Sequence, residues 1–503
     1  MTRYLLLPMQ PTPNGTLHLG HIAGPYLRAD ILARALRRQG DEVSVICGAD
    51  VYENWIQLPA LRSNVSPETL CRSNANAIHE DLRSMGIGVE SWIDPLGEFD
   101  SGAYAALHNE LLNYGVRGGG LFLKSERIPY SQDTGRAVTG VWLLGRCPGC
   151  GLPAGGNCCE NCGFHYQPDQ ILDPRSRLDE GPLVWREEKC WFAKADDPER
   201  IESRLSRLTA SPVFRDLAIR YLRSTGAEVR LTAPGDWGVA NRIDGNGAVV
   251  CNTFFAYCVY CGEHFSRLTG RANPLREGAD RDTQVVALAG VDNLVAALIT
   301  PLVLSGCIPG TRGFDRVILN RFLLLEGAKF STSRRHGIWV SDVAANRSVS
   351  ADELRLFLSS LSLGEDEVNF DVAALIQFVN WHRRRLGSRI AEGAVEIRDI
   401  PAGAILQMLK GRGIPVQYGA VDDIRPDALL AAYLAWLSND DVRRSDPALW
   451  RAALAFLVEP LAPLLAGELR SGRIGEEGVL VRTGRDLVDA DLRSIVHLQQ
   501  ENS

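Results

Sequence analysis

The first 47 residues follow the pattern of a strand, a turn, a helix and a second strand, and this pattern restricts the fold more than any other feature. Residues 3–9, RYLLLPM, form an apolar run typical of a buried strand, and the turn PTPNGT follows. Amphipathic spacing predicts a helix from about His18 to Gln39, and a second apolar strand is expected at 42–47. A crossover of this kind is typical of an α/β fold with a doubly wound parallel sheet.

The rest of the chain divides by character. Helical patterning continues at 67–85 and 101–114, and strand and helix patterns return between 248 and 324. The segment between them holds clustered cysteines and many turn residues, which indicates an insertion that splits the sheet domain. The C-terminal part is mostly helical in pattern. The predicted units are the first half of the sheet domain at 1–115, the insertion at 116–230, the second half at 231–345 and a helical domain at 346–503.

The turn after the first strand carries two histidines three residues apart, within the segment PNGTLHLGH. The N-terminus of a helix exposes free N–H groups and a partial positive charge, which together favour a phosphate. His18 and His21 share a helix face, so both imidazoles can point at one triphosphate. Gly20 between them would let a nucleotide approach the backbone closely. Taken alone, such a pair is also compatible with two incidental histidines at a helix start.

A second polar segment, GAKFSTSRR, follows the apolar run 322–325. Cationic and hydroxyl groups on a mobile loop can close over nucleotide phosphates and stabilise the charge that builds on a leaving pyrophosphate. Lys329, Ser331 and Ser333 are the candidate residues of this loop. The alternative is a solvated basic turn.

Two C-x2-C knuckles lie eight residues apart, and their spacing is typical of a zinc site. Pro and Gly inside the first knuckle allow the tight turn that aims two thiolates at one ion. We expect a structural Zn²⁺ and no disulfide framework. The predicted ligands are Cys147, Cys150, Cys159 and Cys162. Cys158 is a spare thiol, and a further C-x2-C at Cys258 and Cys261 lies in an aromatic stretch that indicates core.

The bulk composition excludes some classes of function. A net charge of −7 over 503 residues is not that of a general polyanion binder, so any nucleic-acid contact needs a local basic patch. The N-terminal apolar run is too short for a secretory signal, and no run of about 18 apolar residues suggests a membrane span. The cytoplasm is therefore the expected location.

The segments quoted above resemble the signatures of class I aminoacyl-tRNA synthetases of the methionyl type. PNGTLHLGH is similar to the family's HIGH signature, and KFSTS is similar to its KMSKS loop, although Thr332 stands where the family has a second lysine. Arg334 or Arg335 could supply the missing charge. The resemblance implies a Rossmann-type catalytic domain split by a zinc-ribbon insertion and followed by a helical domain. It also implies that the chain forms an aminoacyl adenylate from an amino acid and ATP, with Mg²⁺.

The resemblance assigns roles to individual residues. His18, His21 and Lys329 would stabilise phosphates, and Asp292 would bind the ribose from the turn Gly290-Val291-Asp292. Asp50, at the end of the second strand, would hold the substrate ammonium. The remaining ATP-binding candidates, taken from the matching motifs, are Asn14, Gly20, Ser331 and Ser333.

The residues expected around the substrate side chain depart from the family. Gln10 and Thr12 stand where the family has Leu and Tyr, and Thr253 stands at its tryptophan position, whereas Tyr260 is retained. A buried Gln or Thr requires a polar partner on the substrate, which argues against methionine.

The acyl acceptor is open at this point. Residues 351–503 hold 17 Lys and Arg against 23 Asp and Glu, with one basic cluster at 383–385 beside Trp381. This cluster is compatible with RNA contact or with a solvated helix face. We favour a small-molecule acceptor over tRNA: such enzymes occur in natural-product pathways, some of them beside a separate cupin-type partner that builds N–N bonds from an N-hydroxylated amine. The alternatives are a genuine methionine–tRNA ligase and an inactive regulator.

Overall fold

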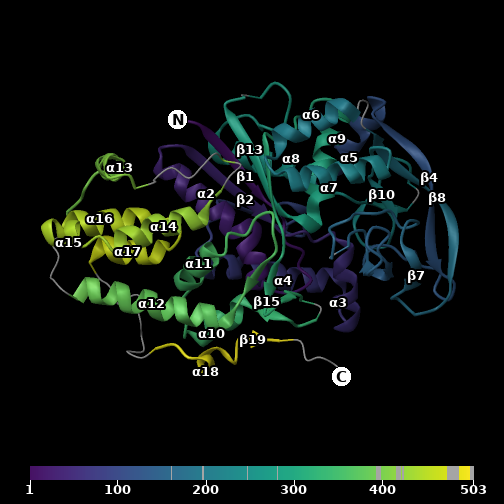
Figure 1. Ribbon diagram of the computed structural model, residues 1–503. Helices are drawn as coiled ribbons and strands as arrows, with labels where there is room; N and C mark the ends of the chain where they lie inside the picture. The colour runs from purple at the N-terminus through teal and green to yellow at the C-terminus, as the bar shows by residue number, and fades with distance from the viewer. Residues whose placement is uncertain are drawn as a thin grey trace.

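The computed structural model describes residues 1–159, 161–194, 198–245, 247–279, 281–332, 334–391, 398–414, 421, 424–472 and 486–498. Its centre is a five-stranded parallel sheet in the order β14–β13–β1–β2–β3 (Figure 1). The strands are β14 (Arg316–Asn320), β13 (Thr283–Gly290), β1 (Arg3–Pro8), β2 (Glu42–Gly48) and β3 (Ser91–Ile93). The parallel sheet and the positions of β1 and β2 confirm the predicted fold class.

Helices cover both faces of this sheet because alternate residues of β1 point to opposite sides. Leu5 and Leu7 pack with residues of α5 (Ser101–Arg117) and α8 (Phe254–Thr269). Tyr4 and Leu6 pack instead with residues of α2 (Leu27–Arg38). The result is the doubly wound arrangement that the sequence predicts. Between β2 and β3 the chain forms α3 (Gln57–Arg62) and α4 (Pro67–Ser84).

The crossover helix is not one regular helix. It begins as α1 (Leu19–His21), passes through a wide π turn at Ile22–Tyr26 and continues as α2. Pro25 lacks an N–H and Gly24 has a ψ of −117°, so the regular hydrogen-bond ladder is interrupted there. A Cβ on Gly24 would lie 3.2 Å from the Asn320 amide at the end of β14. The interruption therefore lets the helix start pass close to the sheet edge.

The chain between α5 and α8 forms the insertion, which lies on the right in Figure 1. Its longest feature is an antiparallel pair of β4 (Leu121–Ser131) and β8 (Leu183–Lys194). A small three-stranded sheet carries the cysteine cluster. Its strands are β6 (Pro153–Gly155), β5 (Leu143–Arg146) and β7 (Leu172–Ser176). The remaining elements are α6 (Pro198–Leu208), α7 (Pro212–Ser224), β9 (Glu228–Arg230), β10 (Thr232–Pro234), β11 (Val239–Ala240) and β12 (Ala248–Val250). The exact domain limits given above stay predictions.

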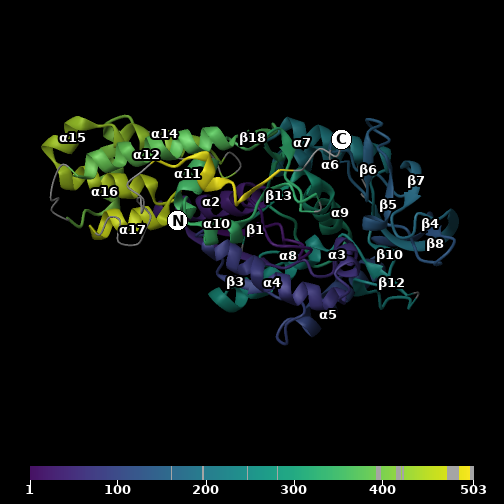
Figure 2. The ribbon, with the colours of Figure 1, turned by 90° about the horizontal axis from the view of Figure 1, so that it is seen from below.

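After β14 the chain forms short strands and then a helical bundle on the other side of the sheet (Figures 1 and 2). The apolar residues from 316 to 325 form two strands, because β14 ends at Asn320 and β15 (Leu323–Leu325) joins a different sheet. Before β14, α9 (Thr300–Cys307) links it to β13. The elements after β15 are β16 (Ala328–Lys329), β17 (Gly337–Ile338), α10 (Val340–Asn346), α11 (Ala351–Ser360), β18 (Val368–Phe370), α12 (Val372–Ala391), α13 (Ala402–Gly411), α14 (Pro426–Leu437), α15 (Asp440–Ser445), α16 (Pro447–Val458), α17 (Pro463–Ser471), α18 (Asp489–Leu492) and β19 (Val496–His497). Within the described ranges, no helix is both long and apolar enough to cross a membrane.

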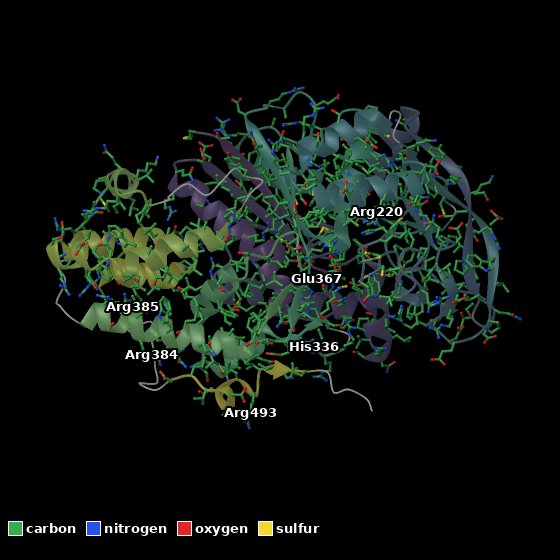
Figure 3. The ribbon with its side chains drawn as sticks, in the orientation of Figure 1. Arg220, His336, Glu367, Arg384, Arg385 and Arg493 are labelled. Atoms are coloured by element: carbon green, nitrogen blue, oxygen red, sulfur yellow. The ribbon has the colours of Figure 1, made fainter. Side chains whose placement is uncertain are left out.

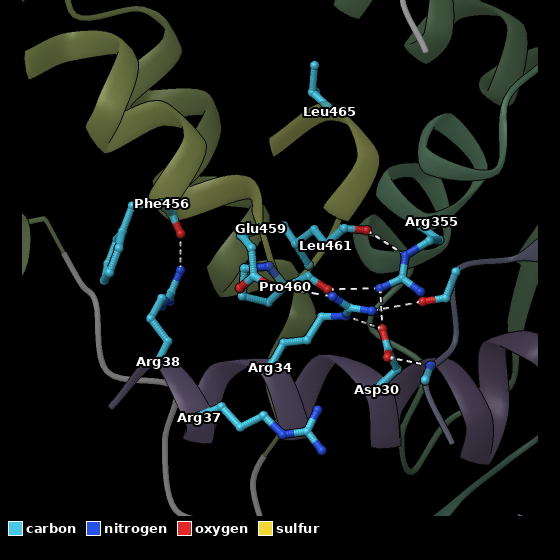
Figure 4. Close-up of polar contacts among 12 residues, drawn as sticks. Asp30, Arg34, Arg37, Arg38, Arg355, Phe456, Glu459, Pro460, Leu461 and Leu465 are labelled. Atoms are coloured by element: carbon cyan, nitrogen blue, oxygen red, sulfur yellow. Dashed lines mark hydrogen bonds and ion pairs between the residues drawn. The ribbon is translucent and has the colours of Figure 1, made fainter. Parts of the chain in front are cut away.

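A buried ion network joins the sheet domain to the helical bundle (Figure 4). Arg355 of α11 is fully buried, and its guanidinium donates to Asp30 of α2 at 2.6 Å and to the carbonyl oxygens of Leu461, Pro460 and Met85. Arg34 donates to the same Asp30 carboxylate at 2.8 Å. Burial raises the pKa of Asp30, but Arg355 and Arg34 outweigh it and lower the pKa below its ordinary value.

Replacing Asp30 by asparagine should destabilise the protein by about 3–5 kcal/mol, because the buried guanidinium of Arg355 would lose its carboxylate and the half-buried Arg34 would retain only its longer contact with Glu459 at 3.4 Å as an ion pair. Thermal unfolding at neutral pH measures the effect. The wild-type advantage should disappear as the pH falls through the lowered pKa of Asp30, since the carboxylate is then protonated. Glu68→Gln is the control, because Glu68 and Arg72 form an exposed pair on α4 that should contribute less than about 1 kcal/mol. Equal losses in both variants would contradict the role of the network.

Candidate active site

His18 and His21 cap the first turn of the crossover helix reciprocally. The backbone N–H of each histidine donates to Nδ1 of the other, in both cases at 3.3 Å. The two rings are stacked, with centroids 3.7 Å apart and planes inclined by 8°. Because both Nδ1 atoms accept hydrogen bonds, the neutral rings carry their protons on Nε2. The pair therefore presents two N–H donors on adjacent parallel rings.

The surroundings keep these rings neutral. Burial lowers the pKa of His18 well below its ordinary value, and the neighbouring His21 adds to this effect. Burial also lowers the pKa of His21 to about 4, with a smaller contribution from Lys329. Near neutral pH both rings are donors without a positive charge, and Lys329 lies close enough to disfavour a positive charge on His21.

The KFSTS loop packs directly on the segment that contains the histidines. Phe330 lies 5.3 Å from the His18 ring, measured between centroids. A Cβ on Gly20 would approach Phe330 Cβ to 2.9 Å, and a Cβ on Gly15 would approach Thr332 Cγ2 to 2.8 Å. Both glycines are thus required for close contact with this loop. The sequence predicts a nucleotide beside Gly20, whereas in this structure Phe330 makes that close approach.

Two hydrogen-bonded pairs shape the loop itself. Lys329 lies on β16, opposite Leu324 of β15, and its Nζ is 3.7 Å from the centre of the Phe322 ring. Ser331 and His336 exchange backbone hydrogen bonds at 2.8 and 3.1 Å. Their pairing closes the loop at its base. Ser333 lies outside the described residues.

Asp292 lies at the carboxyl end of β13, in a short 3₁₀ turn at Val291–Asn293. Its side chain is exposed and accepts a hydrogen bond from Asn293 Nδ2 at 3.2 Å. From the insertion, His165 Nε2 donates to the carbonyl oxygen of Val291 at 3.4 Å. Burial lowers the pKa of His165 to about 4, so this contact is made by a neutral ring. The insertion thereby supports the turn that carries Asp292.

Asp50 lies at the carboxyl end of β2, and its backbone N–H donates to the carbonyl oxygen of Pro11 at 2.9 Å. The residue is 5% exposed. Burial and the neighbouring Glu53 raise the pKa of Asp50 well above its ordinary value, whereas Gln10 lowers it. Asp50 and Gln10 therefore lie together, just beyond the carboxyl ends of the neighbouring parallel strands β2 and β1.

The other candidate residues are placed less closely together. Asn14 donates its backbone N–H to Thr12 at 2.8 Å inside the turn, and both residues are partly exposed. Thr253 is the residue before α8 and is also partly exposed. Tyr260 is buried, and its hydroxyl donates to Asp100 Oδ1 at 2.9 Å, which the sequence does not suggest. Tyr257, one turn earlier on α8, packs beside Cys47 of β2 and is absent from the predicted set.

Residues 8–383 match the family model described as tRNA synthetases class I (M). The chain belongs to this class I synthetase family. A curated relative, methionine–tRNA ligase of Pyrococcus furiosus, is 27% identical over 401 residues, which cover 76% of this chain and 54% of the relative. Methionine–tRNA ligase of Salinibacter ruber is 27% identical over 542 residues, covering 96% and 74%.

The solved structures confirm the fold. Methionyl-tRNA synthetase of Mycobacterium tuberculosis bound by methionyl-adenylate matches with a TM-score of 0.61 at 16% identity, covering 93% of each chain. Its free-state structure matches with a TM-score of 0.57. The chain spans about half to two thirds of the length of the archaeal relatives it matches.

The insertion of this class I synthetase brings four cysteines together. Sγ atoms of Cys147, Cys150, Cys159 and Cys162 all lie within 4.8 Å of one another. Cys147 and Cys162 are 3.7 Å apart at sulfur, and Cys150 and Cys159 are 3.6 Å apart. A tetrahedral zinc with Zn–S bonds of about 2.3 Å has S···S edges of roughly 3.8 Å. The four thiols fit a zinc ion, and Cys258 and Cys261 are fully buried in the core, as predicted.

The purified protein should contain about one zinc ion per chain, and Cys147→Ser should remove it and lower the thermal midpoint. Elemental analysis and thermal unfolding measure both effects. Cys158→Ser is the matched control, because the Cys158 thiol points to the carbonyl of Cys159 and lies outside the four-sulfur group. Full zinc content in Cys147→Ser would exclude this site.

Proposed function

We propose that the chain uses ATP and Mg²⁺ to activate an amino acid as its aminoacyl adenylate. The observation that carries this proposal is the reciprocal capping of His18 and His21, which leaves two Nε2–H donors beside Lys329. Such a set suits a triphosphate, because two neutral donors and one cation can stabilise the negative charge that builds on the leaving pyrophosphate. No side-chain nucleophile is needed.

The reaction is an in-line attack by the substrate carboxylate on the α-phosphorus of ATP. One oxygen–phosphorus bond forms as the bond to pyrophosphate breaks, and the chain positions the reactants and stabilises the developing charge. Asp292 would accept hydrogen bonds from the ribose, and Asp50 would bind the substrate ammonium. The family resemblance implies these roles, and the places of both residues at the carboxyl ends of β13 and β2 support them.

The acyl acceptor in this proposal is a small molecule, and the charge distribution supports it. Arg383 donates to both carboxylate oxygens of Glu353 at 2.6 and 2.9 Å, and this pair is nearly buried. Arg384 donates to Asp486 at 2.6 Å (Figure 3 shows Arg384 and Arg385 on α12). Two of the three arginines of this cluster therefore pair with carboxylates of the same chain, which makes the cluster a weaker candidate for an RNA-reading surface. With an N-hydroxylated amine as the acceptor, a separate cupin-type partner would build the N–N bond. The alternatives remain methionine–tRNA ligation and an inactive regulator.

His21→Ala should lower ATP–pyrophosphate exchange by at least about 100-fold, because one preorganised donor to the phosphates is lost. His21→Gln is the matched variant: its amide nitrogen lies near the position of Nε2 and should retain more activity than His21→Asn, whose nitrogen lies near Nδ1. Unchanged exchange in His21→Ala would remove the phosphate role of this residue.

The KM for the amino acid should rise on acidification, over a range above that of an ordinary carboxyl group. The pKa of Asp50 is raised by burial and by Glu53, so its carboxylate is protonated as the pH falls through that raised value and no longer attracts an ammonium. Asp50→Asn should show a high KM with no such pH dependence. A wild-type KM that stays constant down to about pH 4 would contradict the ammonium role.

With the activated amino acid identified by exchange, transfer to bulk tRNA and to N-hydroxylated amines can be compared. We expect ester formation with the amine and no tRNA charging above background. Efficient charging of tRNA that weakens as the salt concentration rises would instead identify tRNA as the acceptor, because contacts with phosphates are sensitive to salt.

A further inference from the structure

Gln10 is a buried amide without a hydrogen-bond partner. The residue is 3% exposed, and neither Oε1 nor Nε2 has a hydrogen bond to any described residue. Burying an amide in this way costs roughly 2 kcal/mol or more. A polar group on a bound ligand would supply the missing hydrogen bonds and offset this cost.

The position of Gln10 indicates which part of the substrate would meet it. It follows β1 by two residues, as Asp50 follows β2, and the Asp50 backbone is bonded to Pro11 at 2.9 Å. The amide lies close enough to Asp50 to influence its ionisation without reaching hydrogen-bonding geometry. An amino acid with its ammonium on Asp50 would have its side chain within reach of Gln10.

Tyr257 is a second unpartnered polar group at the same edge of the sheet. Its ring is fully buried on α8, and its hydroxyl lies beside the thiols of Cys47 and Cys261, which are weak hydrogen-bonding groups, but has no nitrogen or oxygen partner among the described residues. The hydroxyl lies beside the Cys47 thiol, three residues before Asp50, where α8 packs on β2. A phenol and an amide supply both donors and acceptors, but no charge.

We propose that the activated amino acid carries an uncharged side chain with a hydroxyl or amide group, which Gln10 and Tyr257 bind. This inference rests on the proposed adenylation. An acidic side chain is disfavoured, because Asp50 and Glu53 already place two carboxyl groups nearby and burial raises the pKa of both. A thioether cannot satisfy the amide of Gln10, whereas a hydroxyl or carboxamide can.

Exchange with isosteric pairs tests this directly: threonine against valine, asparagine against leucine, and glutamine against methionine. The polar member of at least one pair should be preferred by about 100-fold or more in kcat/KM. Gln10→Met keeps the shape of the side chain and removes both hydrogen-bonding groups, so it should reduce that preference to below about tenfold. Tyr257→Phe should act in the same direction.

The outcomes separate this inference from adenylation. Preference for methionine, leucine or a charged amino acid, or an unchanged preference in Gln10→Met, would overturn the polar-substrate inference while adenylation stands. No exchange with any amino acid would contradict adenylation. In that case thermal shifts with the same pairs, without ATP, still decide the polar inference, because binding alone should favour the polar member.

A separate observation concerns residues 486–498, a strap that crosses from α12 to the base of the KFSTS loop (Figures 1 and 2). At its start, the backbone of Leu487 forms two hydrogen bonds with the side chain of Asn380, at 2.7 and 2.8 Å. Leu492 and Ile495 are buried along its course. At its end β19 pairs with β17, the strand that follows the loop, with Val496 opposite Ile338.

The end of the strap reaches the histidine pair through one aromatic residue. His497 Nε2 contacts Asp342 at 2.9 Å, and its ring meets Trp339 edge-on with centroids 5.2 Å apart. Trp339 in turn packs edge-on against His18, with centroids 6.3 Å apart, and its backbone bridges to His18. We also infer that His497 is a positioning residue for the catalytic loop, acting through Trp339.

His497→Ala should raise the KM for ATP in exchange by about tenfold, because loop closure on the phosphates would be less well held. The side chain of His497 is 40% exposed, so the thermal midpoint should change little. Arg493→Ala is the control, since Arg493 lies on the same strap, is 76% exposed and pairs with Asp489 one turn earlier (Figure 3). His497→Gln should recover part of the effect through a retained donor to Asp342. Equal ATP KM values in His497→Ala and Arg493→Ala would overturn the inference.

Discussion

The site depends on the reciprocal hydrogen bonding between His18 and His21. Each backbone N–H at the helix start is satisfied by the other residue's imidazole, so the bonds that cap the helix also fix the tautomers of both rings. A serine or aspartate cap would satisfy one N–H equally well but would leave no ring donor. The same two residues thus begin the crossover helix and orient two Nε2–H groups.

Other elements hold this arrangement from several sides. The KFSTS loop covers the glycines next to the histidines, and the strap at residues 486–498 supports the strand that follows the loop. The insertion contributes the His165 contact to the turn before Asp292. Behind the sheet, the buried Asp30 carboxylate ties the crossover helix to the helical bundle through Arg355. Parts of the chain far apart in sequence therefore meet around one short segment.

The sequence predicts much of this because the relevant signals are local. The apolar strand, the glycine turn and the paired histidines lie within 20 residues, and the C-x2-C spacing alone brings four thiols together. What the sequence could not predict depends on long-range packing. Nothing around His497 suggests contact with Trp339, and an Arg at position 355 has the same local pattern as a solvated helix residue, although it is fully buried. Tyr257 rather than Tyr260 lies beside β2 because the start of α8 sets which of the two faces the sheet.

The orientation of the two imidazoles toward a triphosphate is the central claim, and a crystal structure with a non-hydrolysable ATP analogue and Mg²⁺ tests it most directly. We expect phosphate oxygens within about 3.2 Å of Nε2 of both His18 and His21, with each Nδ1 still accepting from the other residue's backbone N–H. A nucleotide bound elsewhere, or rings that turn Nδ1 toward the phosphates and break the reciprocal bonds, would contradict the account.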